Sequence, residues 1–393
     1  MSKKCVIIGA SAASIAVINK LVRLDPEAEI ICITGQDEHP YNKCFLADYL
    51  AGAKDEQSIQ LIPLNGYPRI VFKTGTSLIA IDPIVKTITC SDGSLVPYDR
   101  LFLGMGGSLS ILPCMPKEWH QGIFTFHTLS DANRILEYVG KNHVSKAVII
   151  GAGLSGIECA DVLQKKGIDI TLVERQSRIL NQFFDNDASQ FLVKCIEDSN
   201  GRVLNNQTVV AIRSNSGKVT GVELASGESI EADLLIMATG VRPNIQIAQA
   251  AGIAVVPQGV LVDQYMQTSI PDIYAGGDLI AVTNTLTGEV MTSCTWPDAM
   301  LQGIHAAHAM AGQPKPYLGA AIITSSAFFG IHFAQAGLIE PQKGDQLILK
   351  REAGYYHRFI LREGALKGFS VLGNVHNFGV LRKMILTGQP FDS

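Results

Sequence analysis

Residues 147–158, AVIIGAGLSGIE, decide the fold of this chain: an apolar run leads into a glycine-rich turn and then into a helix-like pattern. Residues 5–14, CVIIGASAAS, repeat this arrangement near the N-terminus. Each pattern predicts a buried strand, a tight turn and a helix N-terminus. Small residues in the turn let the backbone approach a pyrophosphate, which the helix amides and the helix dipole bind. Two such turns suggest two dinucleotides, and two dinucleotides suggest electron transfer between them.

The repeat extends beyond the two turns. Residues 92–106 and 226–240 share a pattern in which a hairpin-like stretch leads to an apolar strand and then to glycine. The interval from Gly93 to Gly106 equals the interval from Gly227 to Gly240. The chain therefore looks like one nucleotide-binding unit used twice.

Length and composition narrow the class of protein. The chain has 393 residues, 47% of them hydrophobic, which predicts two or three domains with sizeable cores. A net charge of −4 and the lack of Lys/Arg runs argue against nucleic acid as a partner. Because there is neither a membrane-spanning apolar run nor a signal-peptide pattern, we expect a cytoplasmic protein without a membrane partner.

Cysteine and histidine spacing predicts no metal site and no disulfide framework. The eight cysteines contain no C-x-x-C pair. His305 and His308 lie three residues apart on a predicted helix, but no further clustered ligands accompany them.

The local patterns predict two βαβ units. The first has a strand over 5–8, a helix over 12–24 and a strand over 29–34; the second has a strand over 147–150, a helix near 154–166 and a strand over 168–173. Pro26 ends the first helix, and Gly167 is the predicted C-cap of the second.

Two crossovers and a change in composition predict the domain organisation. The prolines in residues 110–121 and the segment 240–244 are typical of connections between domains. We expect an α/β protein with two Rossmann-like dinucleotide-binding domains and a small C-terminal α+β domain. The expected boundaries are 1–112 with 241–315 for a discontinuous first domain, 113–240 for the second, and 316–393 for the third.

Residues 268–278, TSIPDIYAGGD, supply the third diagnostic element, a strand that ends in Gly-Gly-Asp. With the two glycine turns, this segment makes residues 3–315 similar to the pyridine nucleotide-disulfide oxidoreductases, flavoprotein reductases with a glutathione-reductase-like fold. The resemblance implies that the first turn holds the FAD pyrophosphate, that the second holds NAD(P), and that Asp278 bonds the FAD ribityl chain. The first and second domains would then be the FAD-binding and NAD-binding domains.

The resemblance assigns residues to each cofactor. Those expected to bind FAD are Gly9, Ser11, Ala12, Ala13, Ser14, Thr34, Lys43, Gly106, Asp278 and Trp296. Those expected to bind the pyridine nucleotide are Gly151, Gly153, Leu154, Ser155, Gly156, Glu158, Glu174 and Gly240. The first turn has serine at two positions of the family pattern G-x-G-x-x-G, and serine is the smallest polar replacement. Trp296 opens a predicted helix whose start, in related flavoproteins, lies at the flavin pyrimidine.

Glu174 is the residue expected to select the nucleotide. It lies about 20 residues beyond the second turn, where a carboxylate accepts from the ribose 2′-OH and repels a 2′-phosphate. Arg175 and Arg178 follow and could instead receive that phosphate. We expect NADH, with NADPH less favoured. Glu158, by resemblance, lies near the nicotinamide; otherwise it compensates the helix dipole.

Residues 40–52, PYNKCFLADYLAG, are similar to the same region of rubredoxin reductases and of nitrite reductase large-subunit N-terminal regions. There the basic residue that matches Lys43 lies against the flavin cofactor. A lysine in that place binds the pyrophosphate or steadies negative charge on the reduced cofactor.

Cys44 leaves an alternative open. Cys44, Leu46 and Tyr49 reproduce the Cys-x-Leu-x-x-Tyr spacing around the single redox cysteine of coenzyme A disulfide reductases and NADH oxidases or peroxidases. A thiolate beside Lys43 would be activated by positive potential. Phe45 and Ala47 depart from the glycine and proline expected in those enzymes, and the tail after residue 315 is shorter than their dimerisation domain.

The sequence thus predicts an FAD-dependent oxidoreductase that takes hydride from NADH onto flavin and passes electrons to a small redox protein such as rubredoxin. The alternatives are a single-cysteine coenzyme A disulfide reductase or NADH oxidase/peroxidase using Cys44, and a non-catalytic flavin-binding subunit. A small-molecule acceptor and either a monomer or a homodimer are compatible with the sequence. The flavin carries the chemistry in these readings, and the protein supplies positioning and electrostatics.

Overall fold

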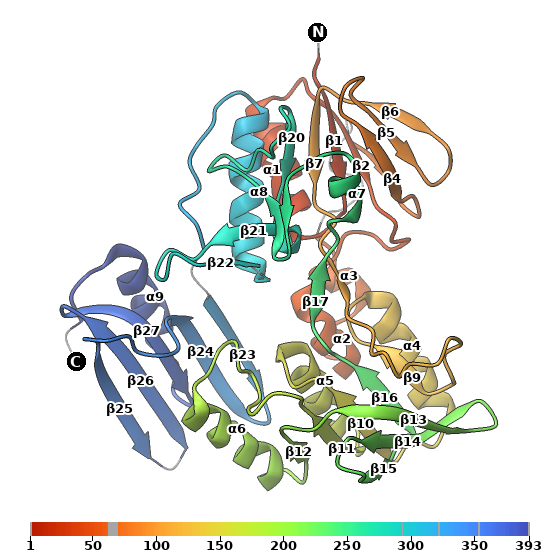
Figure 1. The fold of residues 1–393 in the computed structure, drawn as a ribbon, viewed down its shortest axis with the longest axis vertical. Coiled ribbons are helices and arrows are strands. Elements are labelled where there is room, and N and C mark those ends of the chain that lie inside the picture. Colours follow the sequence, from red (N-terminus) through yellow and green to blue (C-terminus); the bar gives the residue numbers. More distant parts are fainter. Residues whose placement is uncertain (1, 62–69, 293, 321–322, 353, 392–393) are drawn as a thin grey trace. The chain divides into compact units, whose positions relative to one another are not determined.

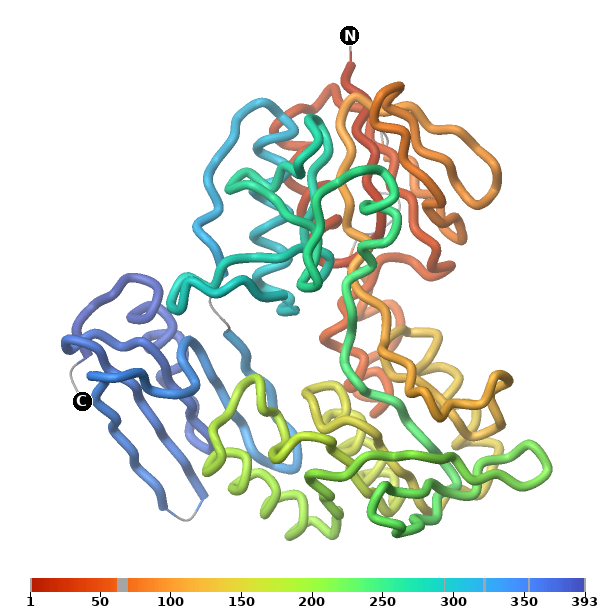
Figure 2. The backbone as a smooth tube through the Cα atoms, viewed as in Figure 1, coloured from red at the N-terminus to blue at the C-terminus, as the bar shows by residue number. Residues whose placement is uncertain are grey.

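The computed structural model of the chain describes residues 2–61, 70–292, 294–320, 323–352 and 354–391. Its contacts group the chain into two compact units. Unit 1 consists of Met1–Phe45, Asp55–Ser108 and Val241–Ala320, and unit 2 of Leu46–Lys54, Leu109–Gly240 and Ala321–Ser393. The colours in Figure 2 show that unit 1 combines segments far apart in the sequence, red to orange and then teal to light blue.

Besides shifts of four residues at 108/112 and five at 315/320, these units differ from the expected domain boundaries in two segments. Residues 46–54, expected in the first domain, are grouped with unit 2. The reason is the short helix α2 (Leu46–Ala51), which packs against α4 (Leu129–Lys141) and α5 (Leu154–Lys165). The C-terminal segment is also grouped with unit 2 and does not form a separate compact unit.

A five-stranded parallel sheet forms the centre of unit 1, in the order β20-β7-β1-β2-β3. Its strands are β1 (Lys4–Ile8), β2 (Glu29–Ile33), β3 (Ile70–Lys73), β7 (Arg100–Leu103) and β20 (Ile273–Ala275). The last four residues of β1 are buried, as expected of a strand covered on both faces. Helices α1 (Ala12–Leu24) and α8 (Trp296–Met310) lie side by side next to this sheet (Figure 1).

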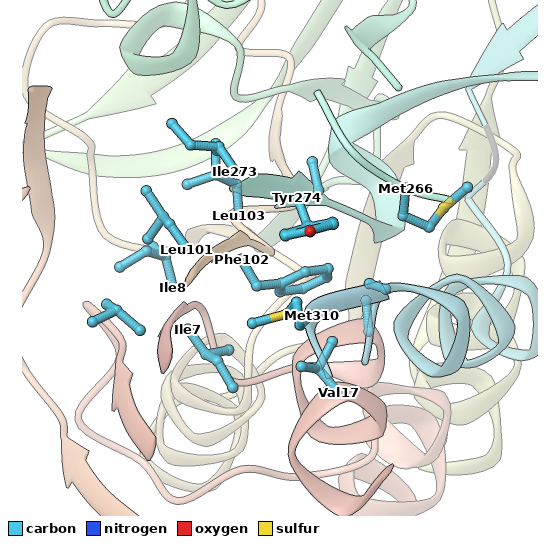
Figure 3. Close-up of a cluster of buried hydrophobic side chains, with 14 of the residues drawn as sticks. Ile7, Ile8, Val17, Leu101, Phe102, Leu103, Met266, Ile273, Tyr274 and Met310 are labelled. Carbon is cyan, nitrogen blue, oxygen red and sulfur yellow. The ribbon is translucent and has the colours of Figure 1, made fainter. Parts of the chain in front are cut away.

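Small residues bring α1 and α8 close together. A Cβ atom added to Gly303 would collide with the backbone of Ala13 and the side chain of Ala16. Figure 3 shows the apolar side chains packed around this contact, among them Ile7, Ile8, Phe102 and Leu103 from the sheet, and Val17 and Met310 from the two helices. Burial stabilises this core by about 25 cal/mol for each Å² of apolar surface removed from water. The carboxyl ends of the strands are therefore held firmly.

Unit 2 contains a second five-stranded parallel sheet, in the order β12-β11-β10-β16-β9. Its strands are β9 (Ile123–Thr125), β10 (Lys146–Ile150), β11 (Asp169–Val173), β12 (Arg202–Leu204) and β16 (Leu234–Met237). The first four strand positions match those of unit 1: β3-β2-β1-β7 in one sheet and β12-β11-β10-β16 in the other. The repeat seen in the sequence is thus a repeat of topology, and the expected α/β class with two Rossmann-like sheets is confirmed.

The fifth strand distinguishes the two sheets. In unit 1 it is β20, which the chain reaches only after passing through unit 2; in unit 2 it is β9, which precedes the repeat. Each unit also has a three-stranded antiparallel meander, which lies in the chain between β3 and β7 in unit 1 and between β12 and β16 in unit 2. The meanders are β4 (Leu78–Asp82), β5 (Thr87–Cys90) and β6 (Leu95–Pro97) in unit 1, and β13 (Val209–Asn215), β14 (Lys218–Leu224) and β15 (Ser229–Glu231) in unit 2.

The C-terminal segment of unit 2 is a five-stranded antiparallel sheet, β23-β24-β27-β26-β25, on which α9 (Phe378–Thr387) packs. This matches the expected small α+β region. Its strands are β23 (Ile323–Phe328), β24 (Ile331–Gly337), β25 (Gln346–Glu352), β26 (Tyr355–Arg362) and β27 (Ala365–Leu372). Unit 2 also contains α6 (Asn186–Asp198).

The remaining elements are short. They are η1 (Lys43–Phe45), α3 (Glu56–Ile59), β8 (Gly107–Leu109), β17 (Val241–Pro243), α7 (Gln246–Ala250), β18 (Val255–Val256), β19 (Gly259–Leu261), η3 (Gly277–Leu279), β21 (Ile280–Thr283) and β22 (Val290–Thr292). Strands β8 and β17 pair with each other. Of the helices in the described residues, none is both long and apolar enough to cross a bilayer.

Candidate functional site

The three helices whose starts are expected to lie at a cofactor, α1, α5 and α8, have no side-chain cap. Their N-cap residues, Ser11 of α1, Gly153 of α5 and Thr295 of α8, make no capping hydrogen bond. In α4 and α6, by contrast, the side chains of Thr128 and Asp185 cap the first turn. Open amides at a helix N-terminus act with the helix dipole to bind anions. The starts of α1, α5 and α8 are therefore suited to phosphate or other anionic groups.

Gly9 and Gly151 form the turn between strand and helix in their units. Their φ angles of +87° and +100° lie in the region that favours glycine. A Cβ atom on Gly9 would collide with the carbonyl group of Gly104, and one on Gly151 with that of Ala238. Both turns thus need glycine, and both bring the backbone close to where a pyrophosphate would lie.

Ser14 is accommodated by a compensating glycine on a neighbouring strand. Ser14 in unit 1 and Gly156 in unit 2 hold equivalent places, as do Gly104 and Ala238, whose amides donate to the β1 and β10 carbonyls at 2.8 Å. A Cβ atom on Gly104 would collide with the Ser14 hydroxyl, which donates to Ile8 O at 3.3 Å. In unit 2 the arrangement is reversed: Ala238, equivalent to Gly104, carries a side chain, and Gly156, equivalent to Ser14, has none. The departure from G-x-G-x-x-G therefore leaves the turn tight.

The other predicted turn residues occupy the same helix starts. In unit 1, Ala12 and Ala13 begin α1, each 5% exposed. In unit 2, Leu154 and Ser155 begin α5. Gly106 and Gly240 follow equivalent strands, β7 and β16, with φ angles of +58° and +83°. Neither has an atom within 4 Å of an added Cβ, so these two glycines serve backbone conformation rather than close packing.

Thr34 and Glu174 hold equivalent positions just after the second strand of each sheet. The side-chain oxygen of each accepts from the amide two residues on: Gln36 N donates to Thr34 Oγ1 at 3.3 Å, and Gln176 N to Glu174 Oε1 at 2.8 Å. The second oxygen of Glu174 accepts from Ala152 N at 2.8 Å. The carboxylate is thereby fixed against the glycine turn of unit 2, and a carboxylate oxygen can accept a further hydrogen bond.

The two arginines after Glu174 have different surroundings. Arg175 is exposed. Arg178 makes an ion pair with Glu340, with 3.6 Å between its NH2 and the Oε1, while Arg358 contacts the other oxygen of Glu340 at 3.3 Å. Glu340 belongs to the C-terminal segment of unit 2. The positive charge of Arg178 is therefore already balanced within the protein, which the sequence did not indicate.

Lys43 and Cys294 lie close enough to Asp278 to interact with its charge. Burial raises the pKa of the Asp278 carboxyl above its usual value, and the Lys43 ammonium partly opposes that shift. Although Cys294 as a whole residue is exposed, burial of its thiol and the Asp278 charge raise the pKa of that thiol to about 12. Cys294 is thus a thiol at ordinary pH. Asp278 lies in η3, directly after β20, so unit 1 holds a desolvated carboxylate at the carboxyl end of its sheet.

Cys44 lies in the 3-10 turn η1 and is exposed. Its backbone amide donates to Asn42 Oδ1 at 3.0 Å. The α-helix that follows, α2, begins at Leu46, so Cys44 precedes the helix rather than opening it. Helix α2 has six residues and supplies little dipole to activate the thiol.

The start of α8 contains a polar network that the sequence did not reveal. Trp296 is its first residue, partly buried against the unit 1 core. Asp298 follows in the first turn, 8% exposed, and accepts hydrogen bonds from Tyr317 and Gln302. Gln302 in turn accepts from Gly277 N, beside Asp278, at 2.7 Å. The usable sequence signal was an aspartate and a glutamine four residues apart on a helix otherwise made mostly of apolar residues.

Glu158 projects from α5 toward the C-terminal sheet of unit 2. Its Oε1 accepts from the Ser326 hydroxyl of β23 at 2.8 Å. Burial, with smaller contributions from the charges of Asp48 and Asp161, raises the pKa of the Glu158 carboxyl to about 7; the Ser326 bond opposes this shift. The glutamate is therefore more than a dipole-compensating surface group.

The raised pKa predicts a pH-dependent contribution of Glu158 to stability. Glu158 binds its proton more tightly in the folded protein, with a pKa of about 7, than in the unfolded chain, near 4.5. This stabilisation is complete below pH 4.5 and is lost as pH rises through 7. Wild type should lose up to about 3 kcal/mol between pH 4.5 and 8 that Glu158→Gln does not lose. Denaturant unfolding across this range measures the difference, and parallel pH profiles for the two proteins would contradict it.

Among the described residues no three His, Cys, Asp or Glu side chains form a group that could hold a metal ion. His305 and His308 have separate surroundings. The His305 ring nitrogen Nδ1 contacts Lys315 O at 3.0 Å, and His308 is 5% exposed. Burial lowers the pKa of His308.

Comparisons with known proteins agree with two dinucleotide sites. The family model described as pyridine nucleotide-disulphide oxidoreductase matches residues 3–311. The chain is 29% identical to NADH-dependent phenylglyoxylate dehydrogenase subunit epsilon of Aromatoleum evansii, covering 98% of this chain and 91% of that protein. It is 33% identical to the NADH oxidase of Methanocaldococcus jannaschii, covering 79% of this chain and 70% of that protein. A chain in the crystal structure of the covalent putidaredoxin reductase–putidaredoxin complex matches with a TM-score of 0.91 and 25% identity, covering 99% of this chain and 94% of that one.

Proposed function

Because this chain belongs to the pyridine nucleotide-disulphide oxidoreductase family, whose members use FAD and NAD(P)H, we propose that it oxidises NADH and passes the electrons to a small redox protein. FAD, when bound, accepts hydride from the nicotinamide and releases electrons one at a time to an acceptor. The residues of this chain bind, orient and electrostatically steady the two cofactors. In this proposal unit 1 is the FAD-binding part and unit 2 the NAD-binding part.

The observation that carries the proposal is the pair of equivalent turns at Gly9 and Gly151, each at an uncapped helix start. Two such turns suit two pyrophosphates in one chain. Asp278 distinguishes the sites, because in unit 1 a desolvated carboxyl group with Lys43 near it follows β20 at the carboxyl end of the sheet. A carboxylate there suits the hydroxyls of a ribityl chain, and the lysine suits the negative charge of the same cofactor.

We assign NADH rather than NADPH to unit 2. Glu174 is held against the turn by Ala152 N, where its charge would repel a 2′-phosphate and its oxygens would accept from a 2′-OH. The ion pair of Arg178 with Glu340 supports the same choice, because that arginine is committed within the protein. Arg175 is then the cation available to favour NADPH.

A protein acceptor is favoured over a thiol-based reaction. Cys44 lies in a 3-10 turn before the six-residue helix α2, and so short a helix contributes little dipole to activate a thiol. The structural match that contains putidaredoxin reductase together with putidaredoxin supports electron transfer to a carrier protein. Because one relative is named as an NADH oxidase, a reaction that uses the Cys44 thiol is the alternative to be tested.

Cys44→Ser should leave electron transfer from NADH to a carrier nearly intact, whereas Lys43→Ala should impair it. A flavin needs no thiol to deliver single electrons, while loss of Lys43 removes the cation that acts on Asp278 and on the bound cofactor. The test measures bleaching of the bound flavin by NADH and then turnover with rubredoxin, ferredoxin, coenzyme A disulfide and oxygen.

The matched control is Cys294→Ser, which changes the second exposed cysteine of unit 1. Turnover abolished by Cys44→Ser but not by Cys294→Ser, with flavin bleaching unchanged, would replace the carrier-reductase proposal by a thiol enzyme. A Cys44 sulfenate or mixed disulfide would be its direct signature.

A second candidate places the same reaction inside a larger assembly. The relative from Aromatoleum evansii is named as a subunit of an NADH-dependent dehydrogenase, and the match spans 91% of that subunit. In this version the acceptor is a redox centre of a partner subunit. Rapid bleaching by NADH with negligible turnover on free carriers would favour it, whereas rapid turnover with a free carrier would exclude it.

A further inference from the structure

A buried chain of hydrogen bonds leads from Tyr317 to the turn that carries Asp278. Tyr317 Oη donates to Asp298 Oδ1, and Gln302 Nε2 donates to Asp298 Oδ2 at 3.1 Å. Gly277 N donates to Gln302 Oε1 at 2.7 Å. Gln302 is 0% exposed, Asp298 8% and Tyr317 9%. All of these residues belong to unit 1.

The direction of these hydrogen bonds follows from the backbone amide of Gly277. The amide of Gly277 can only donate, so Gln302 must turn its oxygen toward the turn and its NH2 group toward Asp298. Asp298 then accepts on one oxygen from Gln302 and on the other from Tyr317. Burial and the Asp298 charge raise the pKa of Tyr317, which keeps the hydroxyl protonated as a donor.

These hydrogen bonds connect helix α8 to the turn at Gly277, whose backbone conformation favours glycine. Gly277 has a φ of +75°, and an added Cβ atom would lie 3.4 Å from that of Ala13. Asp298 and Gln302 lie one turn apart on α8, which is itself packed closely against α1. The hydrogen bond to Gly277 N thus ties the backbone immediately before Asp278 to that helix.

A purely structural role explains this chain poorly. Burying a carboxylate and an amide costs desolvation energy, and apolar side chains of similar size commonly stabilise a core as well or better. The polar groups do, however, fix one orientation, because the Gly277 amide can only donate and Asp298 accepts here from both Gln302 and Tyr317. The hydrogen-bonded series ends at the turn that carries Asp278, so it is this turn that is held in one orientation.

We propose that Gln302 and Asp298 are positioning residues of the FAD site, which act by orienting the Gly277–Asp278 turn through the buried chain from Tyr317. The inference rests on the proposed function in assigning FAD to Asp278. With the turn fixed beforehand, binding does not have to order it, and the affinity for FAD is higher for that reason.

Substitutions that keep or reverse the donor–acceptor order test this proposal. Gln302→Leu removes the acceptor for Gly277 N, and Gln302→Glu keeps that acceptor but sets a second carboxylate against Asp298. Each should weaken FAD binding about tenfold or more, since a buried amide or a buried charge loses its partner. Asp298→Asn alone should have a small effect, because its oxygen can still accept from Gln302 and its NH2 can donate to the Tyr317 oxygen.

The double variant Gln302→Glu/Asp298→Asn is the decisive protein. In it the amide at position 298 donates to the new carboxylate, which still accepts from Gly277 N, and the Tyr317 hydroxyl donates to the amide oxygen. Every donor again faces an acceptor, so FAD affinity should return to within about threefold of wild type. Flavin fluorescence on dilution of each holoprotein gives the dissociation constant, and thermal unfolding of the same samples checks the fold.

Two comparisons keep the result unambiguous. His308 is another buried polar side chain of α8, but it does not belong to the hydrogen-bonded series from Tyr317 to Gly277. His308→Leu should therefore leave FAD affinity unchanged. Folded Gln302→Leu and Gln302→Glu proteins that retain FAD, or a folded double variant that is not rescued, would overturn the positioning role. If Asp278→Ala also retains FAD, the assignment of FAD to this site is wrong; if Asp278→Ala alone loses FAD, only the positioning role fails.

Discussion

Asp278→Ala should weaken FAD binding at least tenfold and yield protein that purifies with little yellow colour. The carboxylate lies directly after β20, and burial raises its pKa because few groups solvate it in the protein alone. Hydroxyl groups of a ribityl chain would supply the missing solvation. A hydrogen bond to a charged group contributes roughly 1.5–3 kcal/mol, which corresponds to about tenfold or more in affinity. Flavin content after gel filtration and the dissociation constant measure the effect.

Asp278→Asn separates the charge from the shape of the side chain. The amide keeps one acceptor oxygen, so its loss of affinity should be smaller than that of Asp278→Ala. Asp263→Ala is a matched control on an aspartate of unit 1 whose carboxylate caps nearby backbone amides instead. Equal FAD affinity in Asp278→Ala and wild type would remove the assignment of the ribityl site to Asp278.

Glu174→Ala should lose most of the discrimination between NADH and NADPH. In wild type the carboxylate accepts from Ala152 N and Gln176 N, and in our proposal it also accepts from the ribose 2′-OH of NADH. Removing the carboxylate takes away one charge-assisted hydrogen bond to NADH, which should raise the apparent dissociation constant of NADH about tenfold. It also removes the repulsion of the 2′-phosphate of NADPH. NADPH should lose much less or gain. Stopped-flow bleaching of the flavin with each nucleotide gives both values.

Glu137→Ala is the control for charge alone, because Glu137 is an exposed glutamate of unit 2 paired with Lys141. It should leave the nucleotide preference unchanged. A preference for NADPH in wild type would mean that Arg175 outweighs Glu174. Arg175→Ala would then be expected to abolish that preference, and Arg178→Ala to leave it, since Arg178 is paired with Glu340.

Features set by neighbours in the chain were predictable from the sequence. The expected helix over 12–24 coincides with α1 (Ala12–Leu24), and the helix near 154–166 differs by one residue from α5 (Leu154–Lys165). Apolar runs, small turn residues and a proline act within a few residues of one another, so their effect is visible in the sequence. The expected strand over 29–34 ends one residue early, at Ile33, and Thr34 begins the loop.

Only the tertiary structure shows which unit residues 46–54 belong to and which strand is the fifth in each parallel sheet. Residues 46–54 carry a helical pattern that does not say which sheet they accompany, and α2 packs on α4 and α5. The fifth strands β20 and β9 come from opposite sides of the repeat. A strand at the edge of a parallel sheet joins by backbone hydrogen bonds, which leave no mark on side-chain type.

The sequence by itself determined two Rossmann-like sheets, the turns at Gly9 and Gly151, and the chemical types of the groups at their ends. Only the tertiary structure decided which of those groups support one another. Ser326 meets Glu158 across 168 residues, Gln302 meets Gly277 across 25, and Ser14 fits because Gly104, on another strand, is glycine. Local patterns arise from steric and hydrogen-bonding preferences between chain neighbours. Partners distant in the chain become neighbours only when the sheet order brings their strands and helices together, so their residue types carry no local signature.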